Sequence, residues 1–539
     1  MFEINTYDYS KKAFAKWVIE SDYHCVYILE NGKDVYIGET NDPKIRARQH
    51  NSNGKWSKKK YNFINMHIIT GELFDISSAK HYQYLLIRLM TADEKFNVVN
   101  GIGSERPHYA RKNKFELYFD ELWMKLEAKG LVKNKEFKQI INTSIYKYSP
   151  YTVLTEQQHN ALTSIIHTID SGETTPHKKG FKTRPILIEG DAGTGKTVIA
   201  ASLFYYLKNT ERYKDKKIAL IYANPSTRSE MQEVFKKVKG LYKKDIISPI
   251  IATKQHFDII ICDESQRLRQ AKNLGMYSKE FVKGNNRLGY DNAHDELDWI
   301  LKNSDCQILF YDKKQSTGPS DIGHKRFCER LYESKRGIRP VKLNDQMRIK
   351  AGNDYVPYIY KLLYQESSIN QVFENYEFKL FNSFSDMVKQ LKEKEEEIGL
   401  CRLSGGYAWE WKGKEDNTLV DITIDGVEIK WNSQTSGWLS NSNTKNEMGS
   451  IYTLPGLDLN YAGVVIGPDL YFDEISNEIK VNKDNFFDNK VKAGVTDEEL
   501  KTYILNTYAV LLTRGICGTY VYVCDEVLKR YIKRFIPCI

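Results

Sequence analysis

The sequence lacks any apolar run long enough to cross a membrane. A spanning helix needs about 20 consecutive, mostly apolar residues, whereas the 41% apolar residues of this chain are interspersed with 28% charged ones. The first residues also lack the basic start and apolar stretch of a secretory signal peptide. We therefore expect a cytoplasmic protein of the soluble globular class, with no membrane partner.

Cysteine is sparse and is not arranged for metal binding or disulfide formation. The eight cysteines form no Cys-x-x-Cys pair, so neither a zinc site nor a disulfide framework is indicated. They are scattered at positions 25, 262, 306, 328, 401, 517, 524 and 538. This usage is typical of a reducing compartment. The chain also has no internal repeat of fixed period.

A strong charge imbalance is absent as well. The chain has 79 basic and 70 acidic residues, a net charge of +9, which fits a polyanionic partner but is equally explained by solubility. One stretch, KIRARQHNSNGKWSKKK (44–60), contains seven Lys or Arg and no acid. It is either a solvated face or a nucleic-acid-binding surface, and its place directly after a predicted hairpin favours the second interpretation.

At 539 residues the chain is too long for one core, and its patterns divide it into several domains. Residues 1–108 combine a hairpin, a basic helix, a strand near 63–70 and an apolar-periodic helix at 79–90, which predicts a small mixed α/β domain. Residues 109–150 are helical and charged, and we expect them to connect this domain to the rest. We expect two further domains at 151–335 and 336–539.

From about residue 185 short apolar strands alternate with helical segments. Near-continuous apolar strands between helices predict parallel sheets covered on both faces, and hence an α/β fold. The strands are expected at 185–190, 216–224, 257–264, 306–312, 462–467 and 518–525. Trp409, Trp411, Trp431 and Trp438 cluster in the least regular region, and we expect them to be core residues rather than base-stacking ones.

The segment GDAGTGKT (190–197) matches the phosphate-binding loop G-x-x-x-x-G-K-[ST] in full. It follows an apolar strand and precedes a helix, the context that this motif requires. Glycines, here Gly190, Gly193 and Gly195, let backbone N–H groups wrap the phosphates of ATP. Lys196 would add a positive charge at the β- and γ-phosphates, and Thr197 would ligate Mg²⁺.

A pair of acidic residues further along the chain fits the same chemistry. FDIIICDE (257–264) is an apolar strand that ends in Asp263 and Glu264, about 65 residues after the loop. Asp263 would hold the magnesium ion through water, and Glu264 would activate the attacking water. The sequence therefore predicts ATP hydrolysis with Mg²⁺ as cofactor.

DESQ (263–266) resembles the second motif of superfamily 1 helicases, and the surrounding segments follow the order of that family. They are LTEQQHNAL (154–162), ANPSTRSE (223–230), FYDKKQST (310–317), LNDQMRIK (343–350), YTLPGLDLNYAGVVIG (452–467) and VLLTRGICGTYVYV (510–523). LLTRG and CRLSGGYAWEW (401–411) look most like the Schlafen-group-3-type helicase/ATPase family. The resemblance covers about 151–539 and implies two RecA-like lobes with ATP between them.

The resemblance also implies roles for individual residues. Gln158 would read adenine, and ANPSTRSE would contact a single strand. Asp312 matches the acid of the third motif and Gln315 its γ-phosphate-sensing glutamine. Arg348 and Arg514 would come from the second lobe, with Arg514 as the finger that stabilises charge on the γ-phosphate. One departure stands in the fifth motif, where residues 454–458 read LPGLD in place of a Gln-Gly-Phe-Glu run; this puts the coupling of hydrolysis to strand movement in doubt.

The N-terminal CVYILENGKDVYIGET (25–40) resembles the GIY-YIG nuclease family. Cys25-Val26-Tyr27 takes the place of Gly-Ile-Tyr, and Tyr36-Ile37-Gly38 matches outright. Arg46 and His50 lie four residues apart on one face of the predicted helix, and Asn100 fits the late asparagine of the family. The resemblance implies metal-dependent phosphodiester hydrolysis with Tyr27, Tyr36, Arg46 and His50 as catalytic residues.

The expected metal ligand of that domain is replaced. The family has a glutamate where HYQYLLI puts Gln83, and an amide oxygen binds Mg²⁺ or Mn²⁺ more weakly than a carboxylate. Three interpretations stay open: an acid such as Glu39, Glu72 or Asp75 substitutes; Gln83 marks a form inactivated by exchange of Glu for Gln; or the domain binds nucleic acid without cutting.

Together these patterns predict a GIY-YIG nuclease domain fused to a superfamily 1 motor. We expect an ATP-dependent enzyme that engages nucleic acid, DNA rather than RNA, and cuts it, with an ATP-driven binding switch as the alternative. The fused architecture suggests defence against phage or foreign DNA. The sequence leaves open whether a homo-oligomer or a partner protein is involved.

Overall fold

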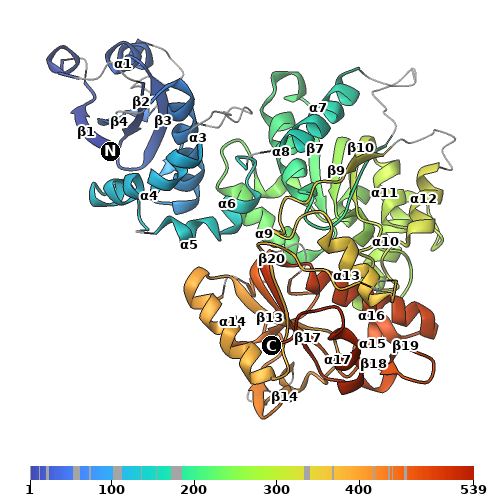
Figure 1. Cartoon of the computed structure of the whole chain (residues 1–539). Coiled ribbons are helices and arrows are strands. Elements are labelled where there is room, and N and C mark those ends of the chain that lie inside the picture. Colours follow the sequence, from blue (N-terminus) through green and yellow to red (C-terminus); the bar gives the residue numbers. More distant parts are fainter. Residues whose placement is uncertain are drawn as a thin grey trace. The chain divides into compact units, whose positions relative to one another are not determined.

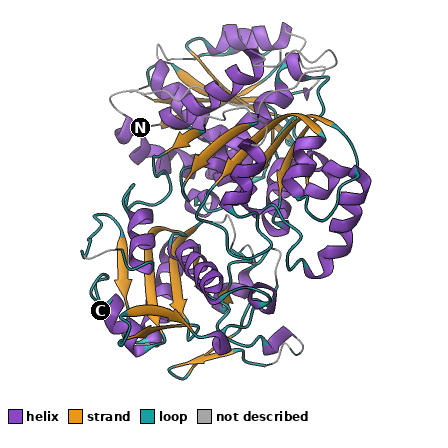
Figure 2. Ribbon diagram, turned by 90° about the vertical axis from the view of Figure 1, so that its right-hand side faces the viewer, coloured by secondary structure: helices purple, strands orange, loops and turns teal. Residues whose placement is uncertain are grey.

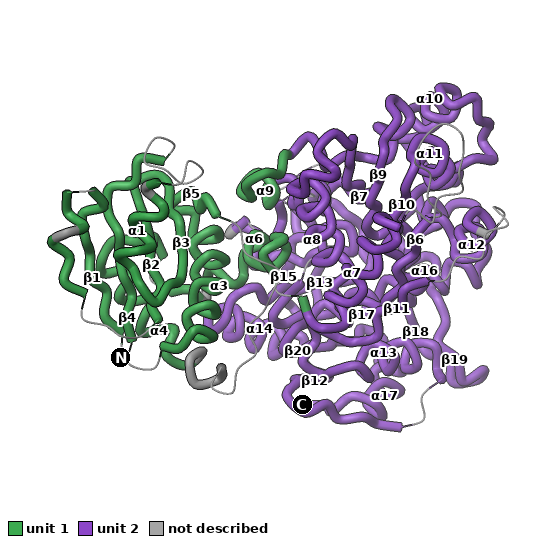
Figure 3. Tube along the Cα trace, turned by 90° about the horizontal axis from the view of Figure 1, so that it is seen from above, with its two compact units in different colours: residues 1–154, 233–242 green, residues 155–232, 243–539 purple. Residues whose placement is uncertain are grey.

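The structure is a computed structural model (Figure 1). It describes residues 2–10, 12–19, 24–52, 61–71, 74–100, 112–134, 136–152, 154–171, 185–332, 340–366, 369–414, 416, 419–434, 437–439, 441–454 and 458–539. The chain divides into two compact units (Figure 3), of which the first contains residues 1–154 and 233–242 and the second contains 155–232 and 243–539.

The first unit is built on a five-stranded sheet of order β1-β4-β2-β3-β5. The strands are β1 (Phe2–Asp8), β2 (Cys25–Glu30), β3 (Asp34–Thr40), β4 (Asn65–Gly71) and β5 (Asn97–Val98). The predicted hairpin is confirmed, since β2 and β3 pair antiparallel. Its turn depends on Asn31, whose Oδ1 accepts from the backbone N–H groups of Lys33 and Asp34, and on Gly32, whose φ of 82° suits glycine. The strand β1, which the sequence patterns did not indicate, pairs with β4.

Helices pack on both faces of this sheet because alternate residues of each strand point to opposite sides. Tyr27 and Tyr36 face α1 (Pro43–Ser52) and pack with its Ala47. Val26 and Ile37 face the other way and share a core with α3 (Ile76–Asp93) and α4 (Lys112–Ala128). In the segment predicted as a connector, the helices α4, α5 (Phe137–Ile141) and α6 (Ser144–Tyr148) belong to the first unit, and their apolar side chains complete its core.

The second unit begins with a six-stranded parallel sheet of order β11-β6-β10-β9-β7-β8. Its strands are β6 (Ile186–Gly190), β7 (Ile218–Tyr222), β8 (Ile246–Ile247), β9 (Phe257–Asp263), β10 (Ser304–Tyr311) and β11 (Val341–Leu343). Its helices are α7 (Glu156–Ser171), α8 (Lys196–Asn209), α9 (Pro225–Lys236), α10 (Ser278–Leu288), α11 (Glu296–Lys302) and α12 (His324–Tyr332); the end of α9, from residue 233, belongs to the first unit. The strand β11 pairs with β6, so this first lobe extends past residue 335 to residue 343.

A second parallel sheet follows, of order β12-β20-β17-β13-β16. Its strands are β12 (Glu377–Leu380), β13 (Cys401–Gly405), β16 (Met448–Gly449), β17 (Leu459–Ile466) and β20 (Gly515–Val523). Its helices are α13 (Tyr355–Leu363), α14 (Phe384–Ile398), α15 (Asn489–Lys492), α16 (Asp497–Leu512) and α17 (Glu526–Ile532). Two small ribbons, β14 (Ile422–Ile424) with β15 (Val427–Ile429) and β18 (Leu470–Asp473) with β19 (Glu478–Val481), complete this lobe.

The predicted fold class is confirmed: a small mixed α/β domain precedes two RecA-like parallel-sheet lobes, whose helices lie against the strands on both faces (Figure 2). The clustered tryptophans are core residues: Trp431 and Trp438 are buried, and Trp409 and Trp411 pack against the apolar cluster that contains Trp431. Within the described ranges, none of the helices combines the length and apolar character of a membrane span.

Candidate active sites

The phosphate-binding loop joins β6 to α8 and needs glycine at two of its positions. Gly193 and Gly195 both have φ of 85°, in the left-handed region that favours glycine. A Cβ at Gly193 would lie 2.0 Å from Oε1 of Gln346, and one at Gly195 would lie 2.0 Å from Nε2 of Gln158. The loop therefore holds its shape only with bare backbone at these points, which suits a cradle of N–H groups for phosphates.

Lys196 and Thr197, at the start of α8, face the acidic ends of the neighbouring strands. The Lys196 ammonium donates to the carbonyls of Gly190 and Asp191 and lies 3.3 Å from Oδ2 of Asp312, past the end of β10. The Thr197 hydroxyl donates to Oδ2 of Asp263, at the end of β9, over 2.7 Å. The parallel order β6-β10-β9 brings these groups to one edge of the sheet.

Asp263 and Glu264 stand in different environments although they are adjacent. Asp263 is fully buried; burial, and then the charge of Glu264, raise its pKa to about 6, while the bond from Thr197 lowers it. Glu264 is partly exposed and has φ of 48°, an unusual conformation for a residue other than glycine. Strained backbone of this kind occurs at catalytic positions.

The glutamines predicted to sense nucleotide are ordered by contacts inside the first lobe. Gln315 donates to Oδ2 of Asp312 over 2.9 Å. Gln158 is buried, accepts from the backbone N–H of Thr155 and donates to the carbonyl of Thr194 in the loop. Gln158 thus supports the phosphate-binding loop directly, and its reading of adenine stays a prediction.

The segment around Arg348 lies against the loop of the first lobe. Met347 donates its backbone N–H to the carbonyl of Gly193, and Gln346 donates its amide to the carbonyl of Ala192. The Arg348 guanidinium pairs with Asp458 over 2.7 Å and donates to the carbonyl of Thr513. The sequence did not indicate Gln346 or Asp458, although Gln346 stands two residues before the predicted arginine.

Arg514 is the next residue after Thr513; it is buried and lies directly before β20. Its charge acts on Tyr360 of α13: burial, and then the charges of Asp312 and Asp191, raise the pKa of Tyr360, and Arg514 lowers it. The Tyr360 hydroxyl donates to the carbonyl of Lys314, which pairs with Asp191 of the loop. Groups of both lobes therefore meet around the loop. Pro455 to Leu457, the departure in the fifth motif, lie outside the described residues.

The donor set beside Lys196 fits a magnesium ion with a nucleotide. Hydroxyl and carboxylate oxygens are the ligands that Mg²⁺ prefers, and Thr197 and Asp263 bring one of each within hydrogen-bond distance. These two residues would hold the ion, and the glycine-lined loop would hold the phosphates.

In the first unit, two side chains bond to the hydroxyl of Tyr27 and a third stacks on its ring. Nε2 of His50 lies 2.7 Å from it, and Nε of Arg46 donates to it over 3.2 Å. The ring of Tyr36 stacks on that of Tyr27 with centroids 6.1 Å apart and meets His50 edge-on at 4.8 Å. The pairing of β2 with β3 and the face of α1 that carries Arg46 and His50 bring together all four residues that the resemblance indicated.

Burial sets the protonation of this cluster. His50 is 3% exposed; burial, and then the charge of Arg46, lower its pKa to about 4, so its ring is neutral at pH 7. Burial, and then Tyr36, raise the pKa of Tyr27, and Arg46 lowers it. Tyr27 is therefore a neutral phenol that accepts from a cation and can donate to an imidazole.

The backbone of β3 is shaped around this tyrosine. A Cβ at Gly38 would lie 2.2 Å from both Cζ and the hydroxyl oxygen of Tyr27, so only glycine leaves room for the ring. Asn100 clamps Ile37 from both sides: its Oδ1 accepts from the Ile37 N–H, and its Nδ2 donates to the Ile37 carbonyl. Asn100 thus has a structural role: it fixes the backbone of Ile37, the residue between Tyr36 and Gly38.

Gln83 binds the same backbone group. Its Nε2 donates to the carbonyl of Ile37 over 3.1 Å. Of the acids that could substitute for it, Asp75 caps α3 through Ser78, and Glu39 lies 3.6 Å from Nδ1 of His24. Glu72 and most of the basic stretch, residues 53–60, lie outside the described residues.

The described part of the chain does not fit a carboxylate-based metal centre in this domain. It contains no group of three or more His, Cys, Asp or Glu side chains that could hold a metal ion. We therefore assign no catalytic step of the first unit to a metal.

Comparisons with known proteins match both the N-terminal domain and the two lobes. Residues 183–525 match the family described as Schlafen group 3, DNA/RNA helicase domain, and residues 23–97 match the GIY-YIG catalytic domain. The uncharacterized protein YPL245W of Saccharomyces cerevisiae is 25% identical over 397 residues, which cover 65% of this chain and 83% of that protein.

Two solved helicase structures are similar at low identity. The Pif1 helicase from Candida albicans is 10% identical, with 71% of this chain and 98% of that chain covered and a TM-score of 0.29. Arterivirus nonstructural protein 10, a helicase, is 11% identical with a TM-score of 0.30. The match covers 64% of this chain and spans 61% of the length of the arterivirus protein.

Proposed function

The chain belongs to the Schlafen group 3 DNA/RNA helicase family and carries a GIY-YIG catalytic domain before its helicase domain; from this we propose that it is an ATP-dependent motor that acts on DNA and cuts it. The observation that carries the motor is the meeting of Lys196, Thr197 and Asp263 at one edge of the first sheet. Glu264, directly after Asp263, would serve as the base for the attacking water.

The second lobe supports this proposal. Arg348 is held by Asp458 and by the carbonyl of Thr513, so Arg348 and Arg514 are ordered next to each other. Both would stabilise negative charge on the phosphates during hydrolysis. A bound magnesium ion would add charge neutralisation at the β- and γ-phosphates. Contacts such as that of Met347 with Gly193 would then change as the lobes open and close around nucleotide.

The Tyr27 cluster supports phosphodiester hydrolysis. In the proposed step, water loses a proton to the Tyr27 oxygen while Tyr27 passes its own proton to Nε2 of neutral His50. The hydroxide formed attacks phosphorus and the bond to the leaving oxygen breaks; that oxygen departs with the bonding electron pair and takes up a proton from solvent water. Arg46, which already donates to Tyr27, would stabilise the charge that develops on the phosphate.

A second candidate function rests on Gln83. An amide that is bonded to the Ile37 carbonyl offers no charge to a metal ion. In this alternative the first unit holds nucleic acid without cutting it, and ATP drives a binding switch. Gln83 itself is proposed as the position where an active family member would hold its metal.

A cleavage assay separates the two candidates. Plasmid, single-stranded DNA and single-stranded RNA are incubated with Mg²⁺ or Mn²⁺, with and without ATP, for the natural protein, Gln83→Glu and the matched control Gln83→Ala. Cutting by the natural protein supports the nuclease. Cutting by Gln83→Glu alone assigns position 83 to the metal and supports the switch. Cutting of RNA but not DNA would contradict the substrate proposed here, and ATP turnover that no nucleic acid stimulates would contradict the motor.

We include in the proposal a role in defence against phage or foreign DNA, for which the fused architecture is the support. Loss of protection against a phage in cells that carry Lys196→Ala in place of the natural protein tests it.

A further inference from the structure

Two arginines lie past the ends of neighbouring strands in the first lobe, away from the nucleotide loop. Arg228 belongs to α9, six residues after the end of β7, and Arg269 stands six residues after the end of β9. Each is partly exposed. They are close enough that the charge of Arg269, after burial, contributes to lowering the pKa of Arg228.

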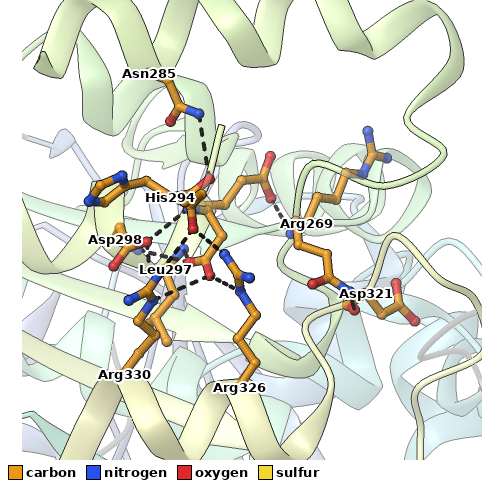
Figure 4. A network of polar contacts seen from close by, with 12 residues as sticks. Arg269, Asn285, His294, Leu297, Asp298, Asp321, Arg326 and Arg330 are labelled. Atoms are coloured by element: carbon orange, nitrogen blue, oxygen red, sulfur yellow. Dashed lines mark hydrogen bonds and ion pairs between the residues drawn. The ribbon is translucent and has the colours of Figure 1, made fainter. Parts of the chain in front are cut away.

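The backbone of Arg269 is fixed on both sides. Its N–H donates to Oε2 of Glu296 over 2.9 Å, and its carbonyl accepts from the Glu296 N–H over 3.0 Å. It also forms an antiparallel bridge with Asp321 (Figure 4). Rigid backbone on both sides reduces the conformational entropy that a bound ligand would have to remove from this residue.

The side chain of Arg269 points away from these backbone contacts. In Figure 4 its guanidinium points away from Asp321. It lies over the ring of Tyr277, 4.6 Å from the centroid, a cation–π contact that leaves the N–H donors at its edge available for a ligand. The Tyr277 hydroxyl donates to Oε1 of Glu296 over 2.7 Å, so the same buried carboxylate orients both the arginine and the ring beneath it.

Arg228 completes the group. Its Nη1 donates to the carbonyl of Tyr222 at the end of β7 over 2.9 Å. The buried Glu296 lies near both arginines: its charge acts on Arg228, and the charge of Arg269 acts on it.

The two other arginines labelled in Figure 4 pair with acids. Arg326 pairs with Asp295 over 2.8 Å, and Arg330 lies 3.4 Å from Asp298 (Figure 4). These pairs join α12 to the start of α11 and explain those residues as structural. Arg228 and Arg269 differ because, among the described residues, neither guanidinium forms an ion pair with an acid as Arg326 and Arg330 do.

We propose that Arg228 and Arg269 form a subsite for one phosphate of a single-stranded nucleic acid, with Tyr277 and Glu296 as the residues that position Arg269. This rests on the proposed function, because it takes the ligand of the motor to be nucleic acid. Planar guanidinium groups bind phosphate oxygens with paired hydrogen bonds. Arg228 lies in ANPSTRSE, whereas Arg269, Tyr277 and Glu296 lie outside every motif that the resemblance indicates.

The experiment measures binding of fluorescent 20-mers, oligo(dT) and oligo(U), by anisotropy at several salt concentrations. Replacing Arg269 by Gln removes one phosphate contact. For single strands, the loss of one contact should reduce the magnitude of the slope of log K against log salt concentration by about 0.7. The fall in affinity for each tenfold rise in salt should then be about fivefold smaller than for the natural protein. Arg269→Lys retains the charge and is expected to keep the slope.

Lys254→Gln is the matched control, since it removes the same charge from an exposed residue before the start of β9, at the opposite edge of the sheet. An Arg269→Gln protein with the slope and affinity of Lys254→Gln would overturn the subsite. If Arg269→Gln fails to fold, as judged by circular dichroism, Arg228→Gln gives the same comparison. A natural protein that binds neither oligonucleotide contradicts the proposed function itself, whereas normal binding with no effect of either arginine contradicts only the subsite.

Discussion

The Tyr27 hydroxyl lies 2.7 Å from Nε2 of His50, although the two residues come from different elements, β2 and α1. Both groups are buried and Arg46 donates to the same oxygen. A phenol between a guanidinium and a neutral imidazole can release its proton to one side while the other side stabilises the oxygen. The contact between Tyr27 and His50 is therefore the basis of the proton transfer proposed for the first unit.

Removing that hydroxyl should stop cutting without affecting the motor. Tyr27→Phe keeps the ring that fills the space above Gly38 but removes the proton carrier, and we expect a loss of about 10²-fold or more in cleavage rate. Arg46→Ala should be similarly impaired. The measurement is plasmid cleavage by the form that cuts, natural or Gln83→Glu, with ATP turnover measured on the same samples. Cleavage by Tyr27→Phe at the parent rate would exclude Tyr27 from the chemistry.

Burial of His50 should make the stability of the first unit depend on pH. Its pKa is about 4 in the folded protein and about 6.5 when unfolded, so between these values the unfolded state binds more protons. The free energy of unfolding should therefore fall as pH decreases from 6.5 to 4, by an amount of the order of 2–3 kcal/mol. Calorimetric melting of the intact chain at several pH values checks this. His50→Gln should lose this component, whereas the exposed His159→Gln should retain it.

Glu264→Gln should separate ATP binding from turnover. The substitution leaves the loop, Lys196 and Asp263 in place but removes the proposed base, so turnover should fall by roughly 10²- to 10⁴-fold while a fluorescent ATP analogue still binds. Lys196→Ala is the contrasting variant, in which binding itself is expected to be lost. Persistent turnover in Glu264→Gln would show that another group activates the water.

Asp469 should destabilise the second lobe at high pH. It is fully buried and accepts from the Tyr508 hydroxyl; burial is the main cause that raises its pKa to about 7. Its folded pKa exceeds the unfolded value of about 3.9, so its stabilising contribution is complete at low pH and is lost as pH rises through 7.

Asp469→Asn cannot ionise and should therefore lack this loss, so its melting temperature should rise relative to the natural protein between pH 5 and pH 8. Melting by calorimetry or fluorescence gives the comparison, with the exposed Asp484→Asn as control. Parallel curves for the natural protein and Asp469→Asn would mean that Asp469 ionises normally.

The sequence by itself determined what depends on short spacing along the chain. The loop 190–197, the strand that ends at Asp263 and the hairpin around Asn31 and Gly32 are each encoded within a few residues, because turn chemistry and alternating apolar residues act locally. Both parallel sheets followed from the same patterns. The strand β1 did not, because it pairs with β4, whose partner residues are 57 to 69 positions away.

The tertiary structure alone decided which distant groups meet. Gln83 bonds to the carbonyl of Ile37, Arg348 to Asp458, and Glu296 to both Arg269 and Tyr277. The members of each pair are separated by between 19 and 110 positions, so no local pattern relates them. Their contacts depend on strand order and on which face of a helix is buried, since the parallel order of the sheets brings the ends of separate strands to one edge.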